Sequence, residues 1–299
     1  MKRVRIALLV VENNDYQAEQ VIAATEAARG LDVDLEVIHT EHDAIEQSGH
    51  VLKLLYRPAD KRPDAILFEP VGTPLAQAAK IAASSGVGWV VLNREVDYVK
   101  DLRRDHSTPI FCVTTSHTDV GRIQGQQIAR FLPNGGAVLY IQGPSDNNAS
   151  VRRTAGVQQT KPANIELRIL RGLWTEQSAF QAVNSWLMLK IGKEISFGVV
   201  AAQNDAMALG AYRAFEEVAT GEERERWLKL PFIGCDGLPN SGQAAVRSGR
   251  LAATIIIPPN AGQAIKAVAA AIRTKQQPPE YIFVDVDSFP PITSLSPRH

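Results

Sequence analysis

Short runs of apolar residues recur along this chain, and each is followed by a longer segment whose apolar residues have helical spacing. A strand that is apolar throughout is buried on both faces, as strands are in parallel sheets covered by helices. The alternation therefore predicts an α/β fold built from repeated strand–helix units. The strands are expected at 6–11, 35–38, 65–68, 89–92, 111–113, 137–141, 166–170, 198–202, 232–234, 252–257 and 281–286.

The segments between the strands carry helix start signals. Asp43 is a good N-cap residue, and Thr73 followed by Pro74 combines a cap with a first-turn proline. Helices are expected at 16–29, 43–55, 73–85, 119–132, 150–160, 176–191, 206–218, 241–248 and 261–273. The residues expected to face inward are Val21, Ile22 and Ala28 in the first helix and Ile45, Leu52 and Leu55 in the second.

One charged stretch, 95–110, interrupts this rhythm and is expected to be a solvated loop. The four strands before it are expected to form one open sheet, and the alternation starts again after it. A chain of 299 residues is long enough for two domains of ordinary size. The sequence therefore predicts two Rossmann-like lobes, each with a parallel sheet, joined near residue 113.

Composition excludes several classes of function. The 32 basic and 32 acidic residues balance, which argues against direct nucleic-acid binding, since that normally requires a basic surplus. No apolar stretch approaches the roughly 20 residues of a membrane span. Residues 1–5, which include three basic side chains, and the apolar run after them lack a signal-peptide cleavage site, and we interpret the apolar run as the first strand. We expect a periplasmic location if a leader was removed, and a cytoplasmic one otherwise.

Nothing in the sequence points to an enzyme, a cofactor or a metal site. Cys112 and Cys235 lie in apolar surroundings and are expected to be core residues. His39 and His42 have no further ligand set near them. The chain contains no phosphate-binding loop, no dinucleotide fingerprint after the first strand and no nucleophile elbow.

The segments that follow the expected strands are rich in hydrogen-bonding side chains. In open parallel sheets ligands bind outside the carboxyl ends of the strands, so these are the segments to inspect. Amides and carboxylates pair with hydroxyl groups, guanidinium groups offer paired donors, and flat rings stack on apolar sugar faces. The chemistry predicts a small, neutral polar ligand. The segments are 12–16, 69–70, 93–94, 143–148, 174–176, 203–205 and 236–237.

Five motifs, in this order along the chain, resemble a known family. They are 118–125 (TDVGRIQG), 152–157 (RRTAGV), 199–211 (VVAAQNDAMALGA), 233–237 (IGCDG) and 251–255 (LAATI). The chain is similar to proteins with the type I periplasmic-binding-protein fold. This fold is shared by ribose- and galactose-type binding proteins of ABC transporters and by effector domains of lac-repressor-family regulators.

The resemblance implies two lobes joined by a three-segment hinge. The N-terminal lobe is expected to hold 1–113 plus 258–285, and the C-terminal lobe 114–257 plus 286–299. A ligand is expected in the cleft between the lobes, with hinge closure as the signal. The implied ligand-binding residues are Asn13, Tyr16, Asn93, Arg94, Arg152, Trp174, Asn204 and Asp236, to which the strand-end segments add Asn14, Glu69 and Asn148.

These residues also have structural alternatives. Asn204 and Asp205 are both good helix caps; we favour ligand contact for Asn204 and capping for Asp205. Asp236 is followed by glycine and suits a turn. The remaining alternatives are core packing of Tyr16 and Trp174, and ion pairs of Arg94 and Arg152 with Glu95 or Asp146.

The chain departs from the family's usual pattern at three positions. Sugar binders often have aspartate where this chain has Asn93, and ribose-type proteins have an amide where it has Ile257. Glu69 is a carboxylate where many members are neutral. These changes leave a monosaccharide or related polyol as the expected ligand class without naming the sugar.

The resemblance leaves two functions open. One is the solute-binding component of an ABC sugar transporter, or a ligand sensor, with a membrane permease or a sensor kinase as partner. The other is the effector-binding domain of a lac-repressor-family regulator without its DNA-binding headpiece.

Overall fold

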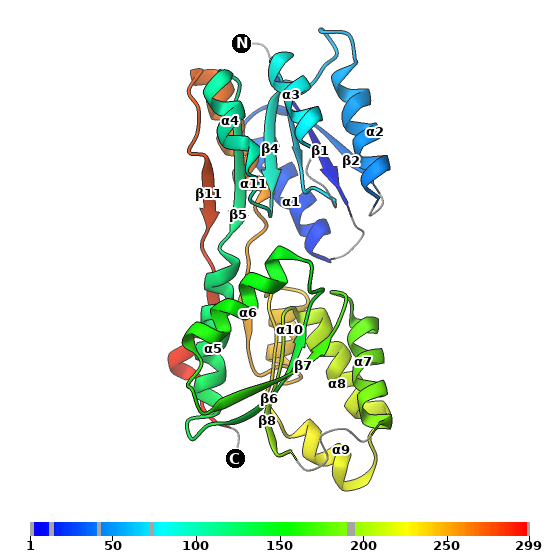
Figure 1. Cartoon of the computed structure of the whole chain (residues 1–299). Helices are drawn as coiled ribbons and strands as arrows, with labels where there is room; N and C mark the ends of the chain where they lie inside the picture. Colours follow the sequence, from blue (N-terminus) through cyan, green and yellow to red (C-terminus); the bar gives the residue numbers. More distant parts are fainter. Residues whose placement is uncertain (1–2, 12–14, 41–42, 72–74, 190–194, 298–299) are drawn as a thin grey trace. The chain divides into compact units, whose positions relative to one another are not determined.

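A computed structural model describes residues 3–11, 15–40, 43–71, 75–189 and 195–297. The chain divides into two compact units and passes between them three times. Unit 1 contains Met1–Thr115 and Pro259–Val284, and unit 2 contains Ser116–Pro258 and Asp285–His299. Each unit has its own sheet and its own cores, and each is described by itself below (Figure 1).

Among the described residues, unit 1 has a six-stranded parallel sheet in the order β11-β5-β4-β3-β1-β2. The expectation of four strands was wrong, because β5 and the late strand β11 join this sheet. The elements are β1 (Val4–Val10), α1 (Asp15–Gly30), β2 (Val33–His39), α2 (Ala44–Leu55), β3 (Ala65–Phe68), α3 (Ala76–Ser84), β4 (Gly88–Leu92), α4 (Tyr98–Asp105), β5 (Ile110–Thr115), α11 (Ala261–Thr274) and β11 (Tyr281–Val284).

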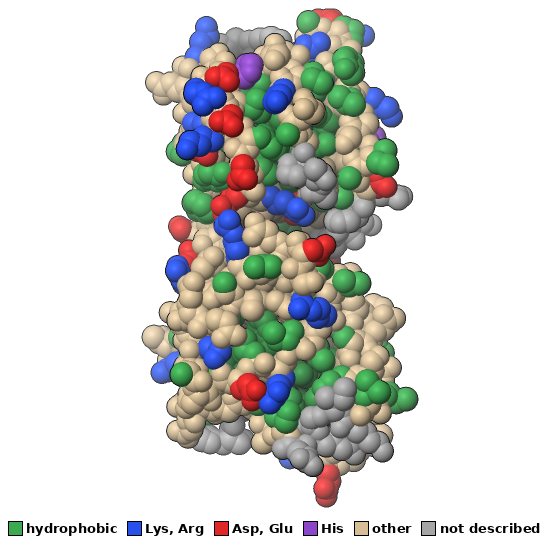
Figure 2. All heavy atoms as spheres, in the orientation of Figure 1, with side chains coloured by type: hydrophobic (Ala, Val, Ile, Leu, Met, Phe, Trp, Pro, Cys, Tyr) green, Lys and Arg blue, Asp and Glu red, His purple; other side chains and the backbone are tan. Residues whose placement is uncertain are grey.

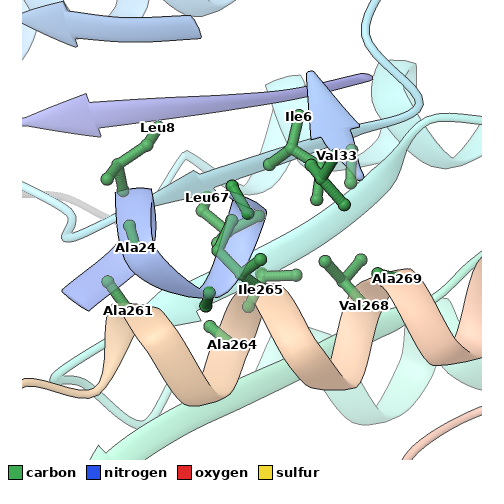
Figure 3. Close-up of a cluster of buried hydrophobic side chains, with 14 of the residues drawn as sticks. Ile6, Leu8, Ala24, Val33, Leu67, Ala261, Ala264, Ile265, Val268 and Ala269 are labelled. Atoms are coloured by element: carbon green, nitrogen blue, oxygen red, sulfur yellow. The ribbon is translucent and has the colours of Figure 1, made fainter. Parts of the chain in front are cut away.

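One face of this sheet is covered by α1 and α11, which are distant in the sequence but packed side by side (Figure 1). Leu8 of β1 and Leu67 of β3 lie in the same core as Ala24 of α1 and Ile265 of α11 (Figure 3). The buried helix residues are mostly alanine. Small side chains let the two helices approach each other and the sheet closely.

The inward-facing residues of the first two helices differ from the expectation. Ile22 is 49% exposed and Ile45 is 84% exposed, so placing them on buried faces was wrong. In α1 the buried face is made of glutamines and alanines, which suits the close contact with α11. In α2 the buried face begins with Gln47 and continues with Val51 and Leu55.

The other face of the sheet carries α2, α3 and α4. The expected loop at 95–110 was wrong, since α4 occupies half of it. Val99 and Leu102 are spaced one helical turn apart and are buried in this second core. Most of the charged residues around them lie on the solvent side of α4. The stretch was predicted as a loop because its charges were considered without the spacing of Val99 and Leu102.

Asp43 caps α2, as expected. Its side chain accepts hydrogen bonds from the backbone N–H groups of Ile45 (2.7 Å) and Glu46 (2.8 Å). Replacing Asp43 by alanine should destabilise the protein by about 1 kcal/mol, because both N–H groups lose their partner. Urea denaturation checks this, with Ser48→Ala in the interior of the same helix as the control. Equal stability of the two variants would contradict the assignment.

Unit 2 has a four-stranded parallel sheet, β7-β6-β8-β9, in the described residues. A separate two-stranded sheet of β10 and β12 is antiparallel. The elements are α5 (His117–Phe131), β6 (Gly136–Gln142), α6 (Asn148–Thr160), β7 (Ile165–Arg171), α7 (Glu176–Met188), β8 (Phe197–Ala202), α8 (Asp205–Glu217), α9 (Gly221–Leu228), β9 (Phe232–Ile233), α10 (Gly242–Arg247), β10 (Thr254–Ile256), β12 (Asp287–Phe289) and η1 (Ile292–Ser294).

The contact between α5 and α6 depends on glycine. A Cβ atom on Gly121 of α5 would collide with the backbone carbonyl of Arg153, and one on Gly156 of α6 would collide with the carbonyl of Thr118. The two helices therefore lie closer together than side chains would allow. This contact fixes the position of α6, which carries part of the candidate site.

Cys112 and Cys235 are free and fully buried, as expected of core residues. Within the described residues no helix has the length and apolar character needed to cross a membrane. On the face shown in Figure 2, lysine and arginine side chains are interspersed with aspartate and glutamate.

Candidate functional site

Three predicted residues of unit 1 meet at the carboxyl ends of β3 and β4. Asn93 directly follows β4, and its Oδ1 accepts hydrogen bonds from the hydroxyl of Tyr16 (3.3 Å) and Nδ2 of Asn260 (2.6 Å). Its own Nδ2 donates to Oε2 of Glu69 at 2.8 Å. The structure thus joins Tyr16, Glu69 and Asn93 in one polar network.

Buried amides that the sequence reasoning missed hold this network. Gln17 donates to Oε2 of Glu69 (3.1 Å), and Gln20 donates to Oδ1 of Asn260 (2.9 Å). Asn260 also donates to the carbonyl of Val113 (2.9 Å) and is completely buried. From sequence Asn260 resembles an ordinary cap of α11, but its side chain makes no capping bond.

The other predicted residues of unit 1 have different positions. Asn13 and Asn14 lie outside the described residues. Arg94 is half-buried beside Asn93. It makes no hydrogen bond or ion pair with the described part of the chain, so the alternative of an ion pair with Glu95 is not seen, and its contact with a ligand stays a prediction.

In unit 2, Arg153, Trp174 and Asp236 come together from α6, the β7–α7 segment and the end of β9. The guanidinium carbon of Arg153 lies 5.5 Å from the centre of the Trp174 ring, and its Nη1 lies 3.8 Å from Oδ1 of Asp236. Nη1 also donates to the backbone carbonyl of Gln203. The Nε of Arg153 is buried and finds no partner in the described residues. A buried donor of this kind is normally satisfied by another group, such as a ligand.

Arg152, the arginine chosen from the sequence, lies one position away and does not join this cluster. Its Nε donates to Oδ1 of Asn148, another predicted residue, at 3.1 Å along the first turns of α6. Helical spacing indicates the difference, because Val157 lies four residues after Arg153 and is fully buried. That periodicity was the available signal for Arg153.

Asp236 and Asp205 are neighbouring acids in different environments. Burial raises the pKa of Asp236 to about 6, although the nearby Arg153 acts in the opposite direction. Burial also raises the pKa of Asp205 well above its usual value, as does the charge of Asp236. Asp205 accepts hydrogen bonds from the hydroxyl of Thr254 (2.6 Å) and the backbone N–H of Gly237 (2.8 Å). Asp205 therefore holds the segment that carries Asp236.

The expected capping role of Asp205 was wrong, because Asn204 is the cap of α8. Asn204 Oδ1 accepts from the backbone N–H of Met207 at 2.9 Å. Its Nδ2 donates to the carbonyl of Trp174 at 2.8 Å. Asn204 thus orients Trp174, and its contact with a ligand stays a prediction.

Three predicted residues have a left-handed backbone: Asn93 (φ 58°), Trp174 (φ 65°) and Asp236 (φ 103°). Apart from glycine, only Asp32 and Lys275 share a positive φ among the described residues. This conformation is costly for a large side chain such as tryptophan, and such strain concentrates at functional sites. The positive φ angles therefore occur in the same strand-end segments that carry the polar and aromatic side chains of the candidate site.

This arrangement suits recognition of a neutral polar molecule. Arg153 offers donors, Asp236 offers an acceptor, and Trp174 offers a flat apolar surface. Among the described residues, no group of three or more histidine, cysteine, aspartate or glutamate side chains is arranged to hold a metal ion.

Residues 6–276 match the model of a family described as "periplasmic binding protein domain". The chain belongs to this family. The Escherichia coli ribose import binding protein RbsB is 25% identical over 257 residues, covering 85% of this chain and 79% of RbsB. The Escherichia coli transcriptional regulator AscG is 27% identical over 218 residues, covering 70% of this chain and 59% of AscG.

Solved structures show the same fold. The periplasmic solute binding protein of an ABC transporter from Actinobacillus succinogenes, solved with bound D-allose, superposes with a TM-score of 0.80. It is 22% identical, and the match covers 96% of this chain and 97% of that protein. The expected type I periplasmic-binding-protein fold is confirmed.

Proposed function

We propose that this protein binds a monosaccharide or a related polyol, as the solute-binding component of an ABC transporter or as a ligand sensor. The observation that carries the proposal is the cluster of Arg153, Trp174 and Asp236 at strand ends of unit 2. It combines an unpartnered buried donor, an aromatic face and a carboxylate. Family membership and the sugar ligands named for RbsB and the Actinobacillus protein support the same ligand class.

We propose that one ligand contacts side chains of both units, and that hinge closure around it is the signal. Unit 1 supplies the Tyr16, Glu69 and Asn93 network. The partner would be a membrane permease or a sensor kinase, in the periplasm if a leader precedes the mature chain. The ligand would be released unchanged, because binding rather than catalysis is the function.

A thermal-shift screen against pentoses, hexoses, polyols, nucleosides and amino acids tests this proposal. A ligand that binds only the folded protein stabilises it by about 2.7 kcal/mol at a hundredfold excess over Kd, which raises the melting temperature. We expect a shift with at least one sugar or polyol, and its recovery unchanged by mass spectrometry after long incubation. Shifts only with nucleosides or amino acids would contradict the ligand class, and conversion of the ligand would contradict the binding role.

AscG supports one alternative, the effector-binding domain of a transcriptional regulator. Regulator domains of this kind usually form dimers, whereas transport binding proteins are usually monomers. Light scattering over a wide concentration range separates the two. A stable dimer would favour the regulator.

A further inference from the structure

Gln203 lies at the centre of the hydrogen bonds behind the unit 2 cluster. It directly follows β8 and is completely buried, and within the described residues its side chain makes no hydrogen bond to Trp174 or Asp236. Its Oε1 accepts from the backbone N–H of Gly143 at 2.8 Å. Its Nε2 donates to the carbonyl of Ser150 and the hydroxyl of Thr154, both at 2.9 Å.

These bonds fix the segment between β6 and α6 at both ends. Gly143 is the first residue after β6, and Ser150 lies in the first turn of α6. A bond from the Ser150 hydroxyl to the Gly143 carbonyl (3.1 Å) closes the same loop. Gly143 must also stay in place for Trp174, because a Cβ at this position would collide with the indole ring.

The backbone of Gln203 also aims Arg153. Its carbonyl accepts from Nη1 of Arg153, and its own N–H donates to the carbonyl of Ile141 in β6 (3.0 Å). The carbonyl therefore belongs to the rigid edge of the sheet. A guanidinium held at Nη1 presents its remaining donors in a fixed direction.

We infer that Gln203 is a positioning residue, which sets the loop 143–150 and the direction of the Arg153 guanidinium for ligand binding. The predicted effect of Gln203 on ligand affinity rests on the proposed function, but its predicted effect on the loop does not depend on any ligand. Glutamine suits this position because the amide supplies an acceptor for Gly143 and donors for Ser150 and Thr154 at once. Methionine has a similar shape and provides neither.

Gln127 offers a matched control. It is also a completely buried glutamine of unit 2, and its Nε2 donates to the carbonyl of Thr254 (3.0 Å) and the hydroxyl of Ser288 (2.9 Å). It makes no bond to Arg153 or to the loop 143–150. Gln127→Met and Gln203→Met should both lower the melting temperature, since each leaves buried polar groups unpaired.

The first measurement is amide hydrogen exchange in the ligand-free protein, compared at equal margins below each variant's melting temperature. In Gln203→Met we expect exchange within 143–150 to accelerate about tenfold or more, as local opening replaces the lost bonds. Gln127→Met should leave this loop at the wild-type rate. Equal exchange in wild type and Gln203→Met would overturn the inference.

The second measurement is the affinity for the sugar that binds wild type best, by calorimetry. Gln203→Met should weaken it about tenfold and Gln127→Met less than about twofold, because only the first releases the loop that leads into α6, the helix that carries Arg153. Equal affinities of the two variants would also overturn the inference. If wild type binds no compound in the screen, the proposed function fails, while hydrogen exchange still decides the role of Gln203.

Gln203→Glu keeps the test decisive if the methionine variant does not fold. A protonated glutamic acid retains a donor toward Ser150 and an acceptor toward Gly143, whereas the ionised form loses the donor. The new carboxyl is buried among Tyr140, Thr154 and Ser150, and Arg153 and Asp236 lie beyond them. In the wild type this site accommodates a neutral amide. The ratio of the amide exchange rate of residues 143–150 in Gln203→Glu to that in wild type, at the same pH, should therefore be near one at low pH and rise with pH. A ratio that does not change with pH would overturn the inference.

Discussion

Replacing Arg153 by methionine should weaken sugar binding about 100-fold, because a buried charged donor to the ligand contributes up to about 3 kcal/mol. Methionine keeps most of the aliphatic stem, so Trp174 retains a packing partner. The variant loses the buried Nε and both terminal nitrogens, including the one near Asp236. Isothermal calorimetry with the best compound of the screen gives the affinity.

Arg152→Met is the matched control for this experiment. The two arginines are adjacent on α6, but Arg152 bonds to Asn148 and lies outside the cluster with Trp174 and Asp236. We expect Arg152→Met to cost less than about fivefold in affinity, which is under 1 kcal/mol. A larger loss with Arg152 than with Arg153 would restore the assignment made from sequence and reject the one made from geometry.

Replacing Asp236 by asparagine should stabilise the ligand-free protein at about pH 8, by up to about 3 kcal/mol. Burial raises the pKa of Asp236 to about 6, from an ordinary value of 3.8. The folded state therefore favours the protonated carboxyl, and the stability it contributes is present below pH 3.8 and lost as the pH rises to about 6. Asparagine is neutral throughout and tolerates the left-handed backbone of this position.

The difference between Asp236→Asn and wild type should consequently be small at pH 4 and reach its full size above about pH 7. Thermal or urea unfolding at several pH values measures it. The same variant should bind sugar more weakly, because a carboxylate is the stronger acceptor. A wild type that is more stable than the variant at pH 8 would show that Arg153 outweighs burial.

Asp119→Asn is a control of opposite sign. The hydrogen bond from Ser116, followed by that from Arg122, holds the pKa of Asp119 below its ordinary value. Its ionised form therefore stabilises the fold above the unfolded pKa, and this contribution is lost as the pH falls through the folded pKa. Asp119→Asn should thus be less stable than wild type at neutral pH and approach it in strong acid. Both carboxylates lie in unit 2, so one protein gives both signs.

Much of the fold follows from patterns within single segments. The apolar runs that became β1, β3 and β4 are buried along their whole length, and such runs are distinctive. The Asp43 cap could also be predicted from a few neighbouring residues. The assignment of β11 to the first sheet could not, because its pairing with β5 joins residues more than 150 positions apart. No periodicity encodes such a partner.

The candidate site divides in a similar way. Asn93, Trp174 and Asp236 were indicated because they lie in the segments that follow strands, and their backbone conformations single them out. Arg153 was missed because Arg152 beside it is also an arginine, so residue type alone does not tell which of the two reaches the site. Gln203 and Asn260 were missed because each acts through a side chain whose partners lie on other elements. Buried amides look like ordinary polar residues until their surroundings are known.

The division of each unit into separate stretches of chain has a consequence for biosynthesis. When the ribosome has made residues 1–115, the α1 face of the first sheet still lacks α11, whose Ile265 and Val268 belong to that core. The helix α11 is complete only at residue 274, and the edge strand β11 only at residue 284. The second unit is also incomplete at that point, since β12 follows. Domains that are continuous in sequence can fold one after another during translation. Here unit 1 is completed only after residue 284 and unit 2 only after β12, so a nascent chain exposes the apolar face of its first sheet until α11 has left the ribosome.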